Sequence, residues 1–372
     1  MTVSNAYDRR LIGRYSNNSR IVYHRPCLWS APPTVKSLPT PTLEPGSVIV
    51  MPLYSWIFNY AVEIYAKGNP RSYNVAFPVI GGANAIGRVA AAPPDAKILK
   101  VGDLVTAEPI IKERDGARPS NTLGLGLSTN GTWAELVRVP LENVLPIDEA
   151  ALRKRNISIK DLAFYPQLMV AYGGFRDVGL TTGETVLIIP ATGNFGGAAV
   201  HVALAMGARV IAMGRNEKIL AELKAIASEK VDTITLSGSV DIDVAALAKY
   251  GPIDVFQDFT PPMATNLSHI QASILSVRAG GRINFMGNVK DLEIPYRAIV
   301  YHGLRIYGTL MYTREQALDM LKLIETGTLK LGPAAALTTK GVFKLEVGNT
   351  ALEFAAKKAG AGRAVHFAPN EE

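Results

Sequence analysis

The stretch Val186-Leu187-Ile188-Ile189-Pro190-Ala191-Thr192-Gly193-Asn194-Phe195-Gly196 decides the fold class of this chain. Its first four residues form a continuous apolar run, which is typical of a parallel strand that is covered on both faces. The apolar residues that follow, about 197–206, predict a buried helix, and Gly207 is well placed to end it. The sequence therefore predicts a strand, a glycine turn and a helix in direct succession.

The same alternation continues toward the C-terminus. Further strands are expected over 209–213, 233–236, 253–258 and 281–287, and a charged helix is expected over about 216–228. Strands that alternate with helices in this way predict a doubly wound parallel sheet.

The part of the chain before this region has a different pattern. The first 45 residues are rich in proline, which disfavours helices and central strands, so we expect them to be irregular. Short strand-like segments bounded by Gly, Pro and Asp follow at 47–50, 75–80, 86–90, 102–107 and 132–139. This spacing predicts a β-barrel or an open β-roll. With 372 residues the chain is long enough for two domains, and the expected fold class is α/β.

Composition excludes several classes of site and partner. Cys27 is the only cysteine, which excludes an intramolecular disulfide framework, a four-cysteine zinc site and an iron–sulfur cluster. The net charge of +7 comes from 39 Lys and Arg against 32 Asp and Glu. These charges are scattered, and the densest cluster, Arg153–Arg155, has no interleaved aromatic residues. We therefore expect neither a nucleic acid nor an acidic membrane surface as a partner.

Nothing in the sequence indicates export or insertion into a membrane. Residues 1–10 have no apolar core and therefore do not form a signal peptide. The most apolar region, 185–213, is interrupted by Asn194, His201 and Arg209, which argues against a membrane span. We expect the protein to be cytoplasmic.

The glycine turn has the pattern of a dinucleotide-binding fingerprint, G-x-G-x-x-G, with Ala191 in the place of the first glycine. In this pattern, Gly193 lets the backbone approach a pyrophosphate, and Gly196 lets the helix pack close to the strand. The helix N-terminus then offers N–H groups and a positive dipole end to the phosphates. The candidate cofactor-binding residues of the turn are Ala191, Thr192, Gly193, Asn194, Phe195 and Gly196.

The residues after the second strand indicate which cofactor is bound. An acidic residue there would bind a ribose 2′-hydroxyl and repel a 2′-phosphate, but this chain has none before Glu217. Arg215 can bind a phosphate through two hydrogen bonds, and Lys218 adds positive charge. NADP(H) is therefore the expected cofactor. The remaining candidate cofactor-binding residues are Gly214, Arg215, Asn216, Lys218 and Gly287, the last of which ends the strand expected over 281–287.

Several further motifs, taken in order, resemble those of the medium-chain dehydrogenases/reductases. The resemblance covers about 45–367 and rests on the segments 44–50, 78–89, 102–105, 170–174, 183–196 and 279–283. It implies a GroES-like β-barrel domain over 1–170 and 310–372 and a Rossmann domain over 171–309. It also implies a small-molecule substrate and a homodimer that forms through the edge strand of the Rossmann domain.

The best-known branch of this family uses a catalytic zinc held by two Cys and one His, and this chain departs from that pattern at every ligand. The first Cys position falls near Phe58 or Asn59, the expected His-Glu is Gly81-Gly82, and the second Cys position falls near Pro166-Gln167. The lobe of the structural zinc, around 109–130, contains no Cys. The five histidines show no close pairing, so no metal site is expected.

The chain is most similar to the zinc-independent branch, which comprises quinone oxidoreductases, alkenal/one reductases and enoyl reductases. This similarity implies transfer of a hydride from NADPH to an activated double bond or a quinone, because such substrates need no metal to become electron-poor. Quinone oxidoreductases carry Asn-Phe-x-Asp at the first zinc position. The corresponding residues here, Asn59-Tyr60-Ala61-Val62, match at Asn and differ at Asp.

The candidate catalytic residues supply hydrogen-bond donors in place of a metal. Asn59 can hydrogen-bond the nicotinamide, the ribose or the substrate carbonyl, and a tyrosine hydroxyl can donate a proton to an enolate. The candidates are Asn59, Tyr54, Tyr60, Tyr65 and Tyr172.

Two alternatives to this function remain open from the sequence. The first is a ketone or alcohol oxidoreductase that uses NADP without zinc and in which a protein donor replaces the metal. The second is an NADPH-binding sensor or scaffold without turnover, which the missing zinc ligands and the missing Asp after Asn59 keep open.

Overall fold

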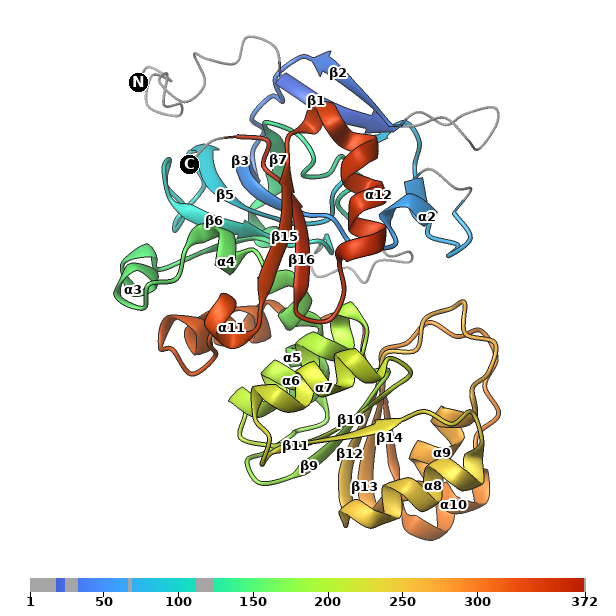
Figure 1. Ribbon diagram of the computed structural model, residues 1–372. Coiled ribbons are helices and arrows are strands. Elements are labelled where there is room, and N and C mark those ends of the chain that lie inside the picture. Colours follow the sequence, from blue (N-terminus) through green and yellow to red (C-terminus); the bar gives the residue numbers. More distant parts are fainter. Residues whose placement is uncertain (1–17, 24–32, 66–68, 112–123, 371–372) are drawn as a thin grey trace. The chain divides into compact units, whose positions relative to one another are not determined.

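The computed structural model describes residues 18–23, 33–65, 69–111 and 124–370 of the chain (Figure 1). The chain divides into two compact units. Unit 1 comprises Met1–Pro166, Leu337–Ala359 and Arg363–Glu372, and unit 2 comprises Gln167–Ala336 and Gly360–Gly362. The expected α/β fold class, with a β-rich part and a parallel sheet, is confirmed. Cys27 lies outside the described residues.

Unit 2 is built on a six-stranded parallel sheet with the strand order β11-β10-β9-β12-β13-β14. The strands are β9 (Thr185–Ile189), β10 (Arg209–Gly214), β11 (Val231–Thr235), β12 (Ile253–Asp258), β13 (Val277–Phe285) and β14 (Arg305–Gly308). The helices are α5 (Tyr165–Asp177, which begins just before the unit), α6 (Asn194–Ala205), α7 (Glu217–Ile226), α8 (Val240–Leu247), α9 (Ser268–Ser276), α10 (Tyr296–His302) and α11 (Arg314–Glu325), with 3₁₀ turns η2 (Ala248–Tyr250) and η3 (Pro333–Ala335).

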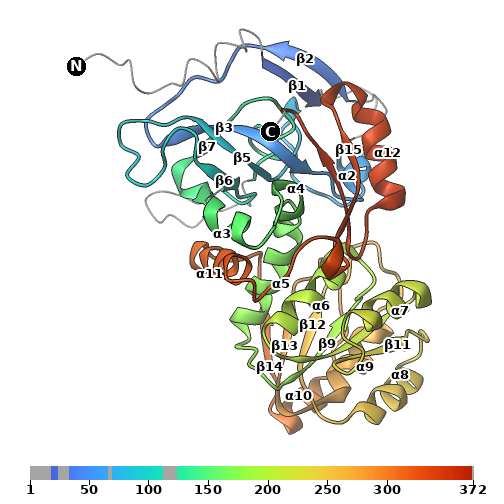
Figure 2. The same cartoon turned by 60° about the vertical axis from the view of Figure 1, so that its left-hand side comes forward.

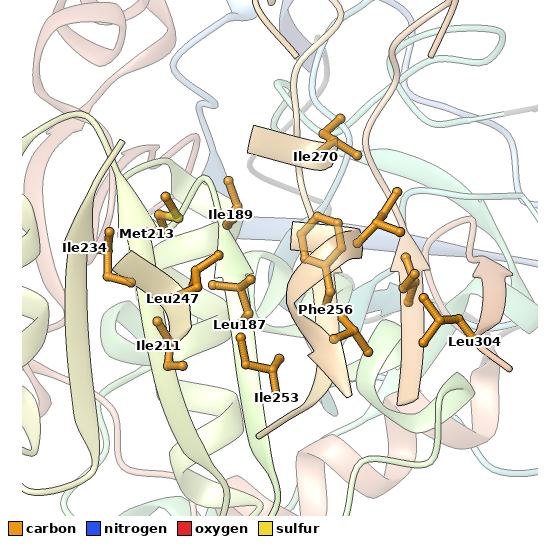
Figure 3. Close-up of a cluster of buried hydrophobic side chains, with 13 residues drawn as sticks. Leu187, Ile189, Ile211, Met213, Ile234, Leu247, Ile253, Phe256, Ile270 and Leu304 are labelled. Atoms are coloured by element: carbon orange, nitrogen blue, oxygen red, sulfur yellow. The ribbon is translucent and has the colours of Figure 1, made fainter. Parts of the chain in front are cut away.

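Helices cover both faces of this sheet (Figures 1 and 2). One face forms an apolar core in which Leu187, Ile211 and Phe256 pack against side chains of α8 and α9 (Figure 3). The opposite face packs so closely on α5 that a Cβ on Gly174 would lie 2.6 Å from Asn284 Nδ2. Because successive side chains of a strand point to opposite faces, burial on both faces explains the continuous apolar run of β9.

Unit 1 contains a seven-stranded sheet, in which six strands follow the order β15-β16-β3-β5-β6-β8 and the seventh, β7, pairs with β3. Unit 1 also contains a three-stranded sheet with the order β2-β1-β4. The strands are β1 (Asn18–Tyr23), β2 (Thr34–Leu38), β3 (Ser47–Trp56), β4 (Val79–Ile80), β5 (Ala85–Ala91), β6 (Leu104–Ala107), β7 (Val137–Pro140), β8 (Val144–Pro146), β15 (Thr338–Phe343) and β16 (Arg363–Phe367). The helices are α2 (Ala61–Tyr65), α3 (Glu149–Lys154), α4 (Ile159–Leu162) and α12 (Gly348–Lys358), with 3₁₀ turns η1 (Leu141–Asn143) and η4 (Leu345–Val347).

The structure differs from the sequence-based expectation in the first 45 residues. These residues were expected to be irregular, but β1 and β2 pair there as antiparallel strands. The prolines do not prevent this pairing because Pro33 and Pro39 flank β2, and β2 lies at the edge of its sheet. Pairing with distant β4 supplies the third strand, which local sequence does not reveal.

The compact units also divide the chain differently from the expected domains at 310–336. This segment was assigned to the β-barrel domain, whereas it is part of unit 2. The reason is that α11 is bound to the end of α5, where Gln316 Nε2 donates to Asp177 Oδ1 at 2.8 Å and Arg176 pairs with Asp319 at 2.8 Å. No helix among the described residues combines the length and the hydropathy that a membrane span requires.

Candidate functional site

The glycine turn between β9 and α6 is shaped for an anionic ligand. Gly193 is the N-cap of α6 and provides no side-chain cap, and no atom would lie within 4 Å of a Cβ placed on it. A Cβ on Gly196, in contrast, would lie 2.0 Å from the carbonyl oxygen of Pro190. The turn therefore keeps open space at Gly193 and close packing at Gly196, and the N-terminus of α6 faces this space with its N–H groups and positive dipole end. These residues fit the pyrophosphate of a dinucleotide.

The turn after β10 carries positive charge. Arg215 and Lys218 are exposed, and Glu217 is the first acidic residue after the strand. Asn216 is the N-cap of α7, and its Oδ1 accepts a hydrogen bond from Ile219 N at 3.1 Å. Gly214 leaves room for Thr192 of the turn between β9 and α6, because a Cβ on Gly214 would lie 2.6 Å from Thr192 Cγ2. Asn216 and Gly214 thus shape the turn, and Arg215 and Lys218 provide its charge.

A buried carboxyl group joins the C-terminal ends of β12 and β13. Asp258 accepts hydrogen bonds from Thr260 N at 2.9 Å, from the Thr260 hydroxyl, and from Gly287 N at 3.1 Å. A Cβ on Gly287 would lie 2.3 Å from Asp258 Oδ2, so this glycine is needed for the approach of the carboxyl group. Burial raises the pKa of Asp258 above its usual range, and the hydrogen bonds from Thr260 and Gly287 oppose this shift.

Sequence reasoning missed this group, although a signal was available. Asp258 is an acidic residue that ends β12 directly after Val255, Phe256 and Gln257, and if it is buried there it must find partners in the fold. Its partner Thr260 Oγ1 also lies 2.8 Å from His269 Nε2, at the start of α9.

The four candidate tyrosines differ in their contacts, although two of them, Tyr60 and Tyr65, both pack against Phe58. Tyr65 donates a hydrogen bond to the Gly126 carbonyl at 2.8 Å, and burial raises its pKa well above the usual value. Tyr60 stacks on Tyr73, and burial also raises its pKa. Tyr54 packs edge-on against the His366 ring at 6.1 Å between ring centroids.

Tyr172 belongs to unit 2, and its hydroxyl accepts a hydrogen bond from Arg176 at 2.8 Å. Arg176 in turn is paired with Asp319. Asn59 is partly buried beside Phe58, around which Tyr60 and Tyr65 pack. The structure thus brings Asn59, Tyr60 and Tyr65 into one aromatic region of unit 1.

The residues at the expected zinc positions do not fit a zinc ion. The carbonyls of Gly81 and Gly82 accept hydrogen bonds from Trp133 N at 2.9 Å and from Thr132 N at 3.0 Å. A Cβ on Gly82 would lie 2.5 Å from Trp133 Cδ1. Backbone and the Trp133 ring therefore leave no room for a side chain at Gly82, the second position of the expected His-Glu pair, and Gly81 at the first position carries no imidazole.

The other expected ligand positions are also without metal-binding groups. Phe58 is buried and packs at 4.8–6.3 Å between ring centroids against Trp56, Tyr60, Tyr65 and Trp133. Gln167, at the second cysteine position, is buried, and its Nε2 has no hydrogen-bond partner among the described residues. Within the described ranges, no group of three or more His, Cys, Asp or Glu could hold a metal ion.

Comparison with known protein families assigns both units. Residues 44–149 match the model of the alcohol dehydrogenase GroES-like domain, and residues 195–326 match the model of the zinc-binding dehydrogenase domain. The chain belongs to the medium-chain dehydrogenase/reductase superfamily. It is an oxidoreductase of this superfamily, whose members depend on a nicotinamide cofactor.

Individual relatives in the superfamily are enzymes with different activities in their names. Acryloyl-coenzyme A reductase of Sulfurisphaera tokodaii is 25% identical over 269 residues, 68% of this chain and 75% of that protein. L-threonine 3-dehydrogenase of Symbiobacterium thermophilum is 27% identical over 289 residues, 74% of this chain and 78% of that protein. Alcohol dehydrogenase 1 of Caenorhabditis elegans is 20% identical over 314 residues, 82% of this chain and 86% of that protein.

Solved structures of the superfamily share the fold. The 2R,3R-butanediol dehydrogenase of Bacillus subtilis matches with a TM-score of 0.77 at 20% identity, covering 95% of this chain and 100% of that chain. A dehydrogenase of Escherichia coli in complex with NADH matches with a TM-score of 0.78 at 18% identity, covering 95% of this chain and 99% of that chain.

Proposed function

We propose that this medium-chain dehydrogenase/reductase is an NADPH-dependent reductase that transfers a hydride to an activated double bond or a quinone without catalytic zinc. The observation that carries the proposal is the packing at Gly82. Backbone and the Trp133 ring leave no room for a side chain at Gly82, the second position of the expected His-Glu pair, and Gly81 stands in place of the ligating His. A substrate that is already electron-poor needs no metal to polarise it, so this chemistry suits the residues that are present.

NADPH would supply the hydride. The open space at Gly193 and the N-terminus of α6 would hold its pyrophosphate, because the positive end of a helix dipole favours anions. Arg215 and Lys218 would hold the 2′-phosphate, and the absence of an acidic residue before Glu217 supports NADPH over NADH.

An enone or enoyl substrate is supported by the relatives named acryloyl-coenzyme A reductase, at 25% and 26% identity. Hydride addition to the β-carbon of such a substrate leaves negative charge on its carbonyl oxygen, and a donor must stabilise this charge. Asn59 and Tyr60 are the candidate donors in unit 1, and water would complete the proton transfer if neither residue does.

The runner-up function is reduction of a ketone or oxidation of an alcohol, also without zinc. It is favoured by the names of other relatives, which include alcohol and L-threonine dehydrogenases. Steady-state oxidation of NADPH with an enone and with the corresponding saturated ketone separates the two. We expect turnover of the enone to be faster, and faster turnover of the ketone would overturn the choice. Tight binding of NADPH without turnover of any carbonyl or quinone would instead indicate a sensor or scaffold.

We further propose a homodimer that forms through β14, which is an edge strand of the unit 2 sheet. Exposed apolar side chains gather on this strand and on the adjacent α10, namely Tyr296, Val300, Tyr301 and Ile306. An unpaired edge with apolar neighbours is suited to pairing with a second copy. Light scattering during size exclusion should give twice the chain mass for the wild type and the chain mass for the Tyr301→Glu/Ile306→Lys variant. A monomeric wild type would overturn this proposal.

A further inference from the structure

A strained turn over 69–73 contacts Tyr60 in unit 1. Asn69 and Ser72 have φ angles of +52° and +58°, in the left-handed region that residues other than glycine rarely adopt. Such strain persists only where surrounding contacts enforce it, and it gathers at functional sites. One enforcing contact is the Asn69 side chain, whose Oδ1 accepts a hydrogen bond from Tyr73 N at 3.0 Å and whose Nδ2 donates to the Tyr73 carbonyl.

The turn presents two side chains to the ring of Tyr60. The Cζ atom of Arg71 lies 4.2 Å from the centroid of this ring. The ring of Tyr73 stacks with it, with 6.4 Å between the centroids and 15° between the planes. Phe58 packs against it from the preceding strand side, with 4.8 Å between the centroids. The Tyr60 ring, which stays partly exposed, is therefore held by two separate segments of the chain.

A second contact fixes Arg71 over the Tyr60 ring. The Nε of Arg71 donates to the carboxylate of Glu63, and the Arg71 side chain is only 15% exposed. Glu63 belongs to α2, and its backbone N–H donates to the Tyr60 carbonyl at 3.0 Å. The phenol, the guanidinium and the carboxylate thus form one connected group, in which Glu63 links Arg71 back to the residue that Arg71 covers.

A guanidinium in this position changes the chemistry of the phenol. The face of an aromatic ring attracts a cation, and the cation stabilises the negative charge that appears when the hydroxyl gives up its proton. Burial raises the pKa of Tyr60, Tyr73 and Tyr65 raise it further, and Arg71 lowers it. Among these effects, only that of Arg71 makes the hydroxyl a stronger acid. Glu63 is the charged partner on the other side of Arg71.

We propose that Arg71 is a positioning residue for Tyr60, which it holds in place and makes a better proton donor to the substrate. The proposal rests on the proposed function, in which Tyr60 is a candidate donor. Once a hydride has added to the β-carbon of an enone, the enolate takes the proton of the Tyr60 hydroxyl, and the O–H bond breaks to leave a tyrosinate. Arg71 stabilises this anion until a proton from water restores the hydroxyl. Each turnover thus consumes one hydride from NADPH and one proton from water.

Steady-state reduction of cyclohexenone by the full-length protein with NADPH tests the role of Arg71. We expect Arg71→Gln to lower kcat about threefold to tenfold and to change the KM for cyclohexenone about twofold or less, because the donor is weakened while the substrate keeps its contacts. The solvent deuterium isotope effect on kcat should rise, since proton transfer becomes slower relative to the other steps. Arg71→Lys keeps the charge and should keep kcat within about twofold of the wild type.

A double-mutant cycle shows whether Arg71 acts through Tyr60. In the Tyr60→Phe background, Arg71→Gln should lower kcat no further, because the hydroxyl on which it acts is gone. Arg138→Gln is the matched control and should keep the kcat of the wild type, since Arg138 of unit 1 is also paired with a glutamate, Glu44. Urea unfolding checks that each variant folds. Arg71→Met, which keeps apolar contact with the ring but no charge, takes the place of Arg71→Gln if that variant does not fold.

The outcomes separate this proposal from the proposed function. If Tyr60→Phe lowers kcat and Arg71→Gln does not, or if Arg71→Gln lowers it equally in both backgrounds, the role of Arg71 is wrong and the reductase activity stands. An equal loss in Arg71→Lys and Arg71→Gln would also overturn the role of the charge. If the wild type reduces cyclohexenone and Tyr60→Phe keeps its kcat, Tyr60 is not the donor and the proposal fails. If the wild type reduces neither cyclohexenone nor a quinone, the proposed function itself fails.

Discussion

Gly82 and Trp133 lie so close together that only glycine fits at position 82. A Cβ on Gly82 would lie 2.5 Å from Trp133 Cδ1 and 2.7 Å from Trp133 N, and the φ of Gly82 is +94°. This contact is the structural reason that the Glu of the expected His-Glu pair cannot stand at position 82.

Gly82→Ala should therefore lower the free energy of unfolding by about 3 kcal/mol, combining backbone strain with a steric clash. Gly102→Ala is the matched control, because Gly102 has the same φ of +94° but no atom within 4 Å of its Cβ position. We expect it to lose only the strain component, about 1 kcal/mol. Urea unfolding of both variants measures the difference, and equal losses would show that the contact with Trp133 is unimportant.

Arg215→Asp should weaken NADPH binding about tenfold to a hundredfold and change NADH binding about threefold or less, because a charged hydrogen bond to phosphate is lost and a repulsive charge is introduced. Lys249→Asp is the control, since Lys249 is also exposed and the change in net charge is the same. Fluorescence titration with both cofactors measures the effect. A uniform loss of affinity for the two cofactors would show that Arg215 does not bind the 2′-phosphate.

Replacement of tyrosines by phenylalanine should separate structural from catalytic hydroxyl groups. Tyr65→Phe leaves the buried Gly126 carbonyl without its donor, so we expect it to cost about 1–3 kcal/mol of stability. Its turnover, measured below its melting temperature, should stay near that of the wild type. Among Tyr54, Tyr60 and Tyr172, at least one replacement should lower turnover with little loss of stability. If all three phenylalanine variants keep the turnover of the wild type, the proton donor is another residue or water.

His366 should make the protein less stable in acid. It is fully buried, its two ring nitrogens have no partner in the described part of the chain, and burial lowers its pKa to about 3. The unfolded chain binds a proton near pH 6.5 whereas the folded protein does not, so stability is lost as the pH falls below that value. At pH 5 the free energy of unfolding is therefore about 2 kcal/mol lower than at pH 8.

His366→Phe should reduce the pH dependence of the unfolding free energy by this amount. Exposed His302→Gln is the control for the removal of a histidine. An unchanged pH dependence in His366→Phe would contradict the expected protonation behaviour of the buried ring.

Local sequence was sufficient for the elements whose information lies within a few residues. The apolar run of β9, the glycine turn and the helix α6 were predicted from one stretch, because strand burial, turn geometry and helix packing each demand particular residues there. The same holds for the exposed Arg215, whose position follows from the end of β10. The absence of zinc ligands could be proposed from residue types alone.

The tertiary structure decided what depends on contacts between distant residues. The strand β1 exists because it pairs with β2 and β4, and α11 joins unit 2 because it binds the end of α5. The hydroxyl of Tyr65 donates to a carbonyl 61 positions away in the sequence. Asp258, at the end of β12, accepts a hydrogen bond from Gly287 N, which follows the neighbouring strand β13. Local sequence determines which backbone conformations and burial patterns are favourable, whereas the hydrogen-bond partners of buried polar groups are set only when separate segments pack together.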